Sequence, residues 1–116
     1  MKKTDTLIIT ALNVATQIGV HAWEQRIKQT LLIDIIIPSN FSACEDDLAK
    51  TTDYAALCQT VTQFVESRSF QLIETVANTV SQLIQDEFKI SELTVKVSKP
   101  HAVKNAGAIQ VIVNKT

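Results

Sequence analysis

The segment that most constrains the fold is residues 31–37, with the sequence LLIDIII. It is apolar and rich in β-branched side chains, and only Asp34 interrupts it. β-Branched residues favour extended backbone, and a short apolar run of this kind is typical of a strand that is covered on both faces. Pro38-Ser39-Asn40 follows and closes the strand, because proline cannot donate to a strand ladder. We therefore predict a strand over 31–37 that needs cover on both sides.

Apolar residues between positions 54 and 88 repeat at the spacing of a helix. This spacing gives each of two segments one apolar face, and a break at Ser67-Arg68-Ser69 separates them. Thr52 or Asp53 precedes the first segment and can accept a hydrogen bond from an amide that the helix leaves unpaired. We predict two helices with the apolar stripes Tyr54, Leu57, Cys58, Val61, Phe64 and Val65, and Ile73, Val76, Ala77, Val80, Leu83, Ile84 and Phe88.

Three further segments, 6–14, 93–98 and 109–114, have the composition or the alternation of strands. The order is then strand, strand, helix, helix, strand, strand. Two helices can cover one face of a four-stranded antiparallel sheet. We therefore predict an α+β fold of that kind, in a single domain over residues 1–116.

Such a sheet leaves its second face open. Four strands cannot close into a barrel around a filled interior, yet residues 31–37 place apolar side chains on both faces. Association through the sheets or edge to edge would cover them, so we expect a homo-oligomer. A monomer with a partly solvated sheet face is the alternative.

The composition argues against several classes of protein. A formal net charge of −1, with both signs interspersed, provides no basic patch for nucleic acid. No apolar run reaches the roughly eighteen residues that a membrane span requires. Cys44 and Cys58 have no CxxC spacing, which favours a reduced, cytoplasmic protein. Neither they nor the two histidines, His21 and His101, have the spacing of metal ligands, so we expect no metal.

Four separated fragments carry polar groups near the ends of the predicted elements. Singly, each group has a structural explanation: Glu24 as a solvated turn residue and Tyr54 as part of a helix stripe. Glu74 is favourable in the first turn of a helix, and Lys99 can shield a strand edge. Together they could perform proton transfer on a small polar ligand. The fragments are Gly19-Val20-His21-Ala22-Trp23-Glu24, Asp53-Tyr54, Leu72-Ile73-Glu74 and Ser98-Lys99-Pro100.

In order, spacing and residue type, these fragments resemble the dihydroneopterin aldolase family. The acidic run before Asp53 and the phrase Phe70-Gln71-Leu72-Ile73-Glu74 extend the resemblance, which covers about residues 6–113. It implies a tunnelling fold, in which subunits join their sheets into a barrel and barrels pair into an octamer of two stacked tetramers. It also implies active sites between subunits.

The resemblance implies a retro-aldol cleavage of dihydroneopterin into 6-hydroxymethyl-dihydropterin and glycolaldehyde, a step of folate biosynthesis. It implies neither a metal nor a lysine Schiff base nor another cofactor, because the C=N of the pterin ring can accept the electrons of the broken bond. The protein then supplies positioning and proton transfer, and the only expected ligand is the pterin.

The resemblance also implies a role for each polar residue. Glu74 anchors the pterin through paired hydrogen bonds, with Leu72 and Ile73 beside the same ring. Lys99 acts in removing the side-chain hydroxyl proton, which requires an amine that is partly neutral at working pH. Tyr54, presented by a neighbouring subunit, helps to protonate the enol intermediate, and Glu24 orients this network. Asp53 is the remaining residue that the resemblance places among those binding the substrate.

Two alternatives remain open from the sequence. His101-Ala102 resembles the related dihydroneopterin triphosphate epimerases, although Trp23-Glu24 and Ser98-Lys99-Pro100 look more like the aldolase branch. A triphosphate would want basic groups at the pocket mouth, for which Arg26, Lys28 and Lys104 are available. The other alternative is a non-catalytic pterin-binding module, which would be expected to lack one of the four polar groups. Side-chain epimerisation can also accompany the aldolase reaction.

Overall fold

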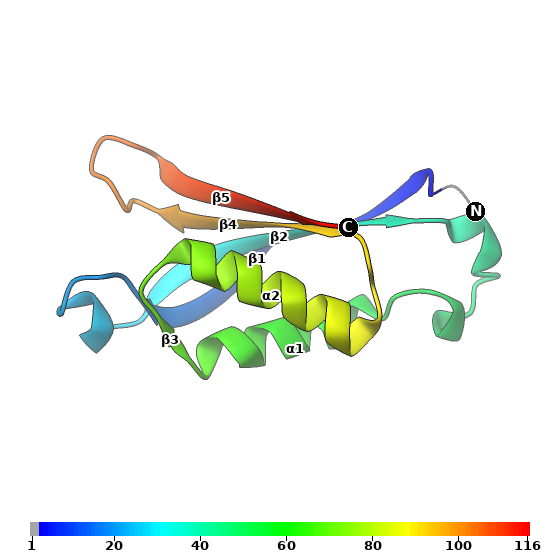
Figure 1. The fold of residues 1–116 in the computed structure, drawn as a ribbon, viewed down its shortest axis with the longest axis horizontal. Helices are drawn as coiled ribbons and strands as arrows, with labels where there is room; N and C mark the ends of the chain where they lie inside the picture. Colours follow the sequence, from blue (N-terminus) through cyan, green and yellow to red (C-terminus); the bar gives the residue numbers. More distant parts are fainter. Residues whose placement is uncertain (1–2) are drawn as a thin grey trace.

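The computed structural model describes residues 3–116 as two layers, a five-stranded sheet and a pair of helices on one of its faces (Figure 1). The molecule is elongated, with extents of 49 × 27 × 21 Å. The single domain over 1–116 stays a prediction, and Met1 and Lys2 lie outside the described residues. Within the described part of the chain, no helix is long and apolar enough to cross a membrane.

The elements follow the predicted order, with one added strand. They are β1 (Asp5–Ile18), η1 (Glu24–Arg26), β2 (Gln29–Ser39), η2 (Phe41–Ala43), η3 (Leu48–Lys50), α1 (Tyr54–Glu66), β3 (Ser69–Phe70), α2 (Ile73–Phe88), β4 (Leu93–Pro100) and β5 (Ala108–Lys115), where η denotes a short 3₁₀ helix. The α+β class and the two helices are confirmed, and the Asp53 side chain caps α1 by accepting a hydrogen bond from the Ala56 amide.

The prediction of a four-stranded, wholly antiparallel sheet was wrong. The strand order is β3-β1-β2-β4-β5, and β3 pairs parallel with β1. The reason is that β1 continues to Ile18, well past the predicted end at position 14, so its last backbone groups need partners. The extended segment Ser69–Phe70, which the sequence indicated only as a break between helices, provides them.

A bulge in β1 keeps the apolar side chains on the helix side. Ile9 pairs with Ile35 and Leu12 with Ile33, so two residues of β1 oppose the single residue Asp34. Ala11 takes the left-handed conformation there, with φ 54°. The odd-numbered residues before the bulge and the even-numbered residues after it therefore face the helices.

The core lies between the sheet and the helices, and it contains most of the predicted stripe residues. Its fully buried members include Leu31, Ile33, Ile35, Leu57, Val61, Val65, Val76, Val80, Ile84, Val95 and Val97. Tyr54 was wrongly placed in this stripe, since it is 60% exposed. Helical side chains lean toward the helix N-terminus, so the first residue of α1 projects past the helix end instead of over its packed face.

Among the described residues, no other part of the chain covers the opposite face of the sheet (Figure 1). Ile8 and Ile112 are exposed there, and Leu32 and Ile36 are half-buried. The helices therefore cover one side of the central strand, and association through the other side stays a prediction.

Candidate active site

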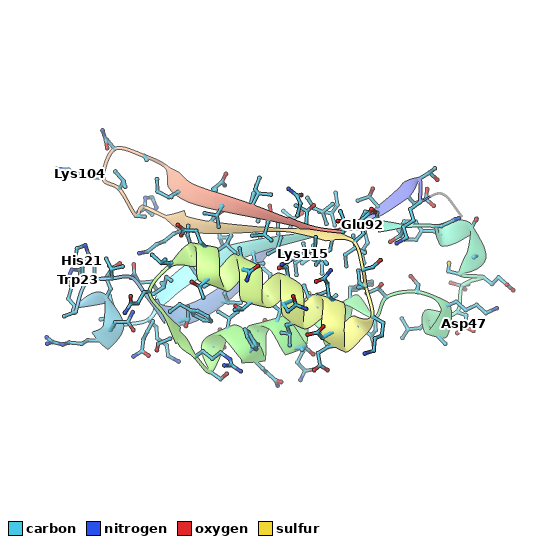
Figure 2. The ribbon with its side chains drawn as sticks, in the orientation of Figure 1. His21, Trp23, Asp47, Glu92, Lys104 and Lys115 are labelled. Carbon is cyan, nitrogen blue, oxygen red and sulfur yellow. The ribbon has the colours of Figure 1, made fainter. Side chains whose placement is uncertain are left out.

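An open cavity of about 390 Å³ lies at the end of the molecule where β1, β3 and η1 meet. Three of the four fragments singled out in the sequence line it: the loop after β1, the start of α2 and the end of β4. Figure 2 shows His21 and Trp23 at this end, together with Lys104 on the β4–β5 hairpin, and Asp47 at the opposite end. The fold therefore brings together segments that are some 25 to 80 residues apart in the chain.

The central contact in this cavity is an ion pair between Glu24 and Lys99. Lys99 Nζ lies 2.7 Å from Glu24 Oε2, and the two side chains are only 14% and 7% exposed. Glu24 begins η1, whose turn is closed by a hydrogen bond from its amide to the His21 carbonyl. Lys99 follows Val95 and Val97 on the helix-facing side of β4. The local expectation of two solvated residues was therefore wrong.

Two further donors hold the Glu24 carboxylate. Gln29 Nε2 donates to Oε2 at 3.2 Å, and the His21 amide donates to Oε1 at 3.4 Å. The hydrogen bond from Lys99 is the main cause that lowers the pKa of Glu24 to about 2, against burial, which raises the pKa. The carboxylate is therefore ionised at any physiological pH.

Gly19 makes room for this carboxylate. It has a φ of 136°, which disfavours any residue with a side chain, and an added Cβ would overlap with the Glu24 carboxylate group. Its amide donates to the Phe70 carbonyl at 3.1 Å, next to the β1–β3 pair. The sequence marked Gly19 as part of a fragment but gave no role for it.

The start of α2 forms another wall of the cavity. Ile73 is buried and Glu74 lies in the first turn, as predicted, and Leu72 is the N-cap residue. All three line the cavity with Glu24 and Lys99. One open site thus has a free carboxylate, an apolar wall and a buried ion pair, which suits a flat polar ring with a reactive side chain.

Asp53 and Tyr54 are not brought to this cavity. They lie at the start of α1, whose 13 residues span about 20 Å and run from the η3 end of the molecule toward β3 (Figure 1). The Asp53 carboxylate is engaged as the cap of α1, and Tyr54 is exposed. Within one chain, the structure separates these two residues from the other predicted site residues.

Several cavity residues had no role assigned to them from the sequence, although His21, Trp23 and His101 lay in or beside the fragments singled out. His21 and Trp23 stack with ring centroids 6.3 Å apart, and His101 adopts a left-handed conformation with φ 58° at the cavity wall. Gln29 had no signal at all, because a single glutamine before an apolar strand is unremarkable. The basic residues Arg26, Lys28 and Lys104 do not line the cavity. In residues 3–116, no three His, Cys, Asp or Glu side chains are grouped as metal ligands.

Known proteins give a consistent picture. The family model described as dihydroneopterin aldolase (FolB) matches residues 7–114. The dihydroneopterin aldolase of Haemophilus influenzae is 38% identical over 111 residues, which cover 94% of each chain. That of Escherichia coli K12 is 38% identical over 113 residues, covering 96% of this chain and 93% of the relative.

A solved structure agrees with the fold. The E. coli dihydroneopterin aldolase in complex with neopterin superposes with a TM-score of 0.91 at 37% identity, covering 97% of this chain and all of that one. The fold, the length matched and the identity over nearly the whole sequence all agree. The chain belongs to the dihydroneopterin aldolase family.

Proposed function

We propose that the cavity is the substrate site through which this chain acts as a dihydroneopterin aldolase in folate biosynthesis. The reaction cleaves dihydroneopterin into 6-hydroxymethyl-dihydropterin and glycolaldehyde. The observation that carries the assignment of the site is the buried Glu24–Lys99 ion pair, which opens on the same cavity as Glu74.

Glu74 is proposed to anchor the pterin. A carboxylate can accept two parallel hydrogen bonds from the ring amino group and the adjacent N–H, which fixes the orientation of the ring. Leu72 and Ile73 supply the wall beside it. The E. coli relative solved with neopterin supports a pterin ligand for this site.

Lys99 and Glu24 are proposed to act on the side chain of the substrate. Removal of the side-chain hydroxyl proton lets the C–O bond become C=O, the adjacent C–C bond breaks, and its electron pair passes into the ring C=N. Glycolaldehyde leaves, and protonation of the resulting enol at carbon gives the hydroxymethyl product. Lys99 passes one of its own protons to water and takes the hydroxyl proton in its place, while Glu24 holds its amine in position.

Tyr54 is proposed to complete the site from a neighbouring subunit, where it donates the proton to the enol, with Asp53 beside it in the expected binding set. The exposure of Tyr54 and its separation from its own cavity support this arrangement. The uncovered sheet face supports a homo-oligomer, for which we propose the octamer of two stacked tetramers. We also place the enzyme in the cytoplasm.

The test is anaerobic incubation of the purified protein with dihydroneopterin, with and without a chelator, followed by chromatography of the pterins. We expect 6-hydroxymethyl-dihydropterin and glycolaldehyde in both conditions. Dihydroneopterin triphosphate serves as a competing substrate. If only an inverted triphosphate forms, the chain is an epimerase, and pterin binding without any turnover would make it a binding module.

Two variants separate the proposed roles in the same assay. Lys99→Ala should lose turnover far more than pterin affinity, whereas Glu74→Ala should lose affinity first. Pterin dissociation constants from equilibrium fluorescence, measured beside single-turnover rates, provide the comparison. Equal losses of affinity and rate in both variants would contradict the division of roles.

A further inference from the structure

We propose that Gln29 is a positioning residue of the aldolase reaction. Its side chain links the Glu24 carboxylate to the backbone at the end of β1 and thereby holds the Lys99 amine toward the cavity. This inference rests on the proposed function. It assigns a role to a residue for which the sequence gave no signal.

The contacts of the Gln29 amide join three parts of the site. Its Nε2 donates to the Ile18 carbonyl at 2.9 Å and to Glu24 Oε2 at 3.2 Å. An amide nitrogen has two N–H groups, so each bond can use one of them. The oxygen that Gln29 contacts is the same one that lies 2.7 Å from Lys99 Nζ. Gln29 therefore links the ion pair to the backbone at the end of β1.

The ion pair gains from such a link because the elements that carry its two members do not by themselves fix both side chains. Glu24 lies on a 3₁₀ helix of three residues, and Lys99 reaches the pair through a long flexible side chain. Apart from Lys99 and Gln29, the only donor to the Glu24 carboxylate among the described residues is the His21 amide, at the long distance of 3.4 Å. Gln29 starts β2, the central strand of the sheet, and its backbone is paired with Thr16 of β1.

A positioning role predicts an effect on rate more than on binding. A reacting group displaced by about 1 Å can lose on the order of a hundredfold in rate. We expect Gln29→Met, which keeps the length of the side chain but has no donor, to lower kcat about tenfold. KM should change by less than about twofold, because the pterin anchor at Glu74 is untouched.

Gln29 also lines the cavity, so a direct contact with the substrate must be distinguished from action through Glu24. A double-mutant cycle does this. In a Glu24→Ala background, Gln29→Met should change kcat by less than about twofold, because the group that it positions is gone. An equal loss of kcat with and without Glu24, or a rise in KM at constant kcat, would overturn the proposal.

Gln25→Met is the matched control. Gln25 Nε2 also makes two hydrogen bonds to backbone, to the Gly19 carbonyl at 2.7 Å and the Phe70 carbonyl at 2.8 Å, but none to Glu24. Its replacement should lower thermal stability, and its effect on kcat should be the same with and without Glu24. If Gln29→Met does not fold, Gln29→Leu, which also lacks a donor and adds no charge, enters the same cycle, with the same coupling expected and the same outcomes against it.

A second readout does not depend on activity. The bond from Gln29 favours the charged carboxylate, so Gln29→Met should raise the pKa of Glu24 from about 2 toward its ordinary value of 4.5. Titration of the Glu24 carboxyl carbon by NMR measures this. An unchanged pKa of Glu24 would show that Gln29 does not hydrogen-bond to its carboxylate, and would overturn the proposal even if the enzyme is active. Conversely, a raised pKa in a protein without aldolase activity would support the contact and reject the proposed function.

Discussion

At Glu24, donors from three parts of the chain converge on one carboxylate: the Lys99 amine, the Gln29 amide and the His21 backbone. Gly19 leaves the space in which the carboxylate lies. Burying a charge is unfavourable unless it is paired and hydrogen-bonded, and here both conditions are met. The same contacts that make the buried carboxylate tolerable also place the Lys99 amine at the cavity.

This arrangement predicts a pH dependence of stability. The folded-state pKa of Glu24 is about 2, below the ordinary 4.5, so the ionised carboxylate stabilises the folded state above pH 4.5. That contribution should be lost as the pH falls from 4.5 through 2. We therefore expect the difference in unfolding free energy between the natural chain and Glu24→Gln to shrink over this range.

Urea unfolding at a fixed protein concentration between pH 7 and pH 2.5 measures the difference. Glu45→Gln is the control, because Glu45 pairs with Lys50 at the surface, where the side chains are 71% and 47% exposed. Such an exposed pair should contribute little at any pH. A difference for Glu24→Gln that stays constant down to pH 2.5 would contradict the lowered pKa.

The sequence pointed to Glu24 and Lys99 only through the conjunction of fragments, and the structure shows why. Their environment is made by residues about 75 positions apart, and no local pattern reports a contact over that separation. Gln29 and Gly19 act on the carboxylate through hydrogen bonding and through the absence of a side chain. No periodicity or spacing marked Gln29, and Gly19 was marked only as part of a fragment, with no indication of what it does.

Among the elements, the strands depend on details that alternation does not reveal. Asp34, the one polar residue in the run 31–37, seemed to interrupt a buried strand. In the structure its Oδ1 accepts a hydrogen bond from the Ala11 amide at 2.6 Å, and its Oδ2 lies 3.2 Å from Lys96 Nζ. Asp34, which interrupts the apolar run, is thus the hydrogen-bond partner of the bulge in β1.

We expect Asp34→Ala to destabilise the fold by about 1 kcal/mol, since it leaves the Ala11 amide without its partner. Lys96→Met is the matched control, because it removes the ion pair and keeps the hydrogen bond to the bulge. It should cost less than about 0.5 kcal/mol, since Lys96 and Asp34 are partly exposed. Thermal unfolding and amide exchange at Ala11 would show both effects, and equal losses in the two variants would exclude the bulge as the cause.

The helices were predictable because each spans several turns of a consistent apolar stripe, and Asp53 gave a cap with a clear mechanism. The strand β3 was not, because two residues cannot display a period. It forms only because β1 extends to Ile18 and offers backbone groups at that point. Tertiary pairing, not local propensity, therefore defines the edge of the sheet next to the candidate site.

At the scale of the whole molecule, the candidate site is divided between two ends. The cavity with Glu24, Lys99 and Glu74 lies at one end of a particle 49 Å long, and Tyr54 begins a helix that starts toward the other (Figure 1). An exposed tyrosine cannot reach the cavity of its own chain across the length of α1. Head-to-tail association of identical chains would place the two ends together.

This leads to a prediction for mixed oligomers. Lys99→Ala and Tyr54→Phe chains should each be nearly inactive alone. When they are unfolded and refolded together, a site can take Lys99 from one chain and Tyr54 from the other. With random mixing in a head-to-tail ring, about one quarter of the sites would be intact and activity should return to that level.

A mixture of Lys99→Ala with Glu74→Ala is the decisive control. Both residues line the cavity of the same chain, so every site in such a mixture carries at least one defect, and activity should not rise above that of the two variants measured separately. Native mass spectrometry confirms that hybrids have formed in both mixtures. Recovery in the first mixture alone establishes that Tyr54 acts across the interface. If hybrids form and neither mixture recovers, Tyr54 does not act in the neighbouring site. Recovery in both would mean instead that Lys99 and Glu74 of one chain serve different sites.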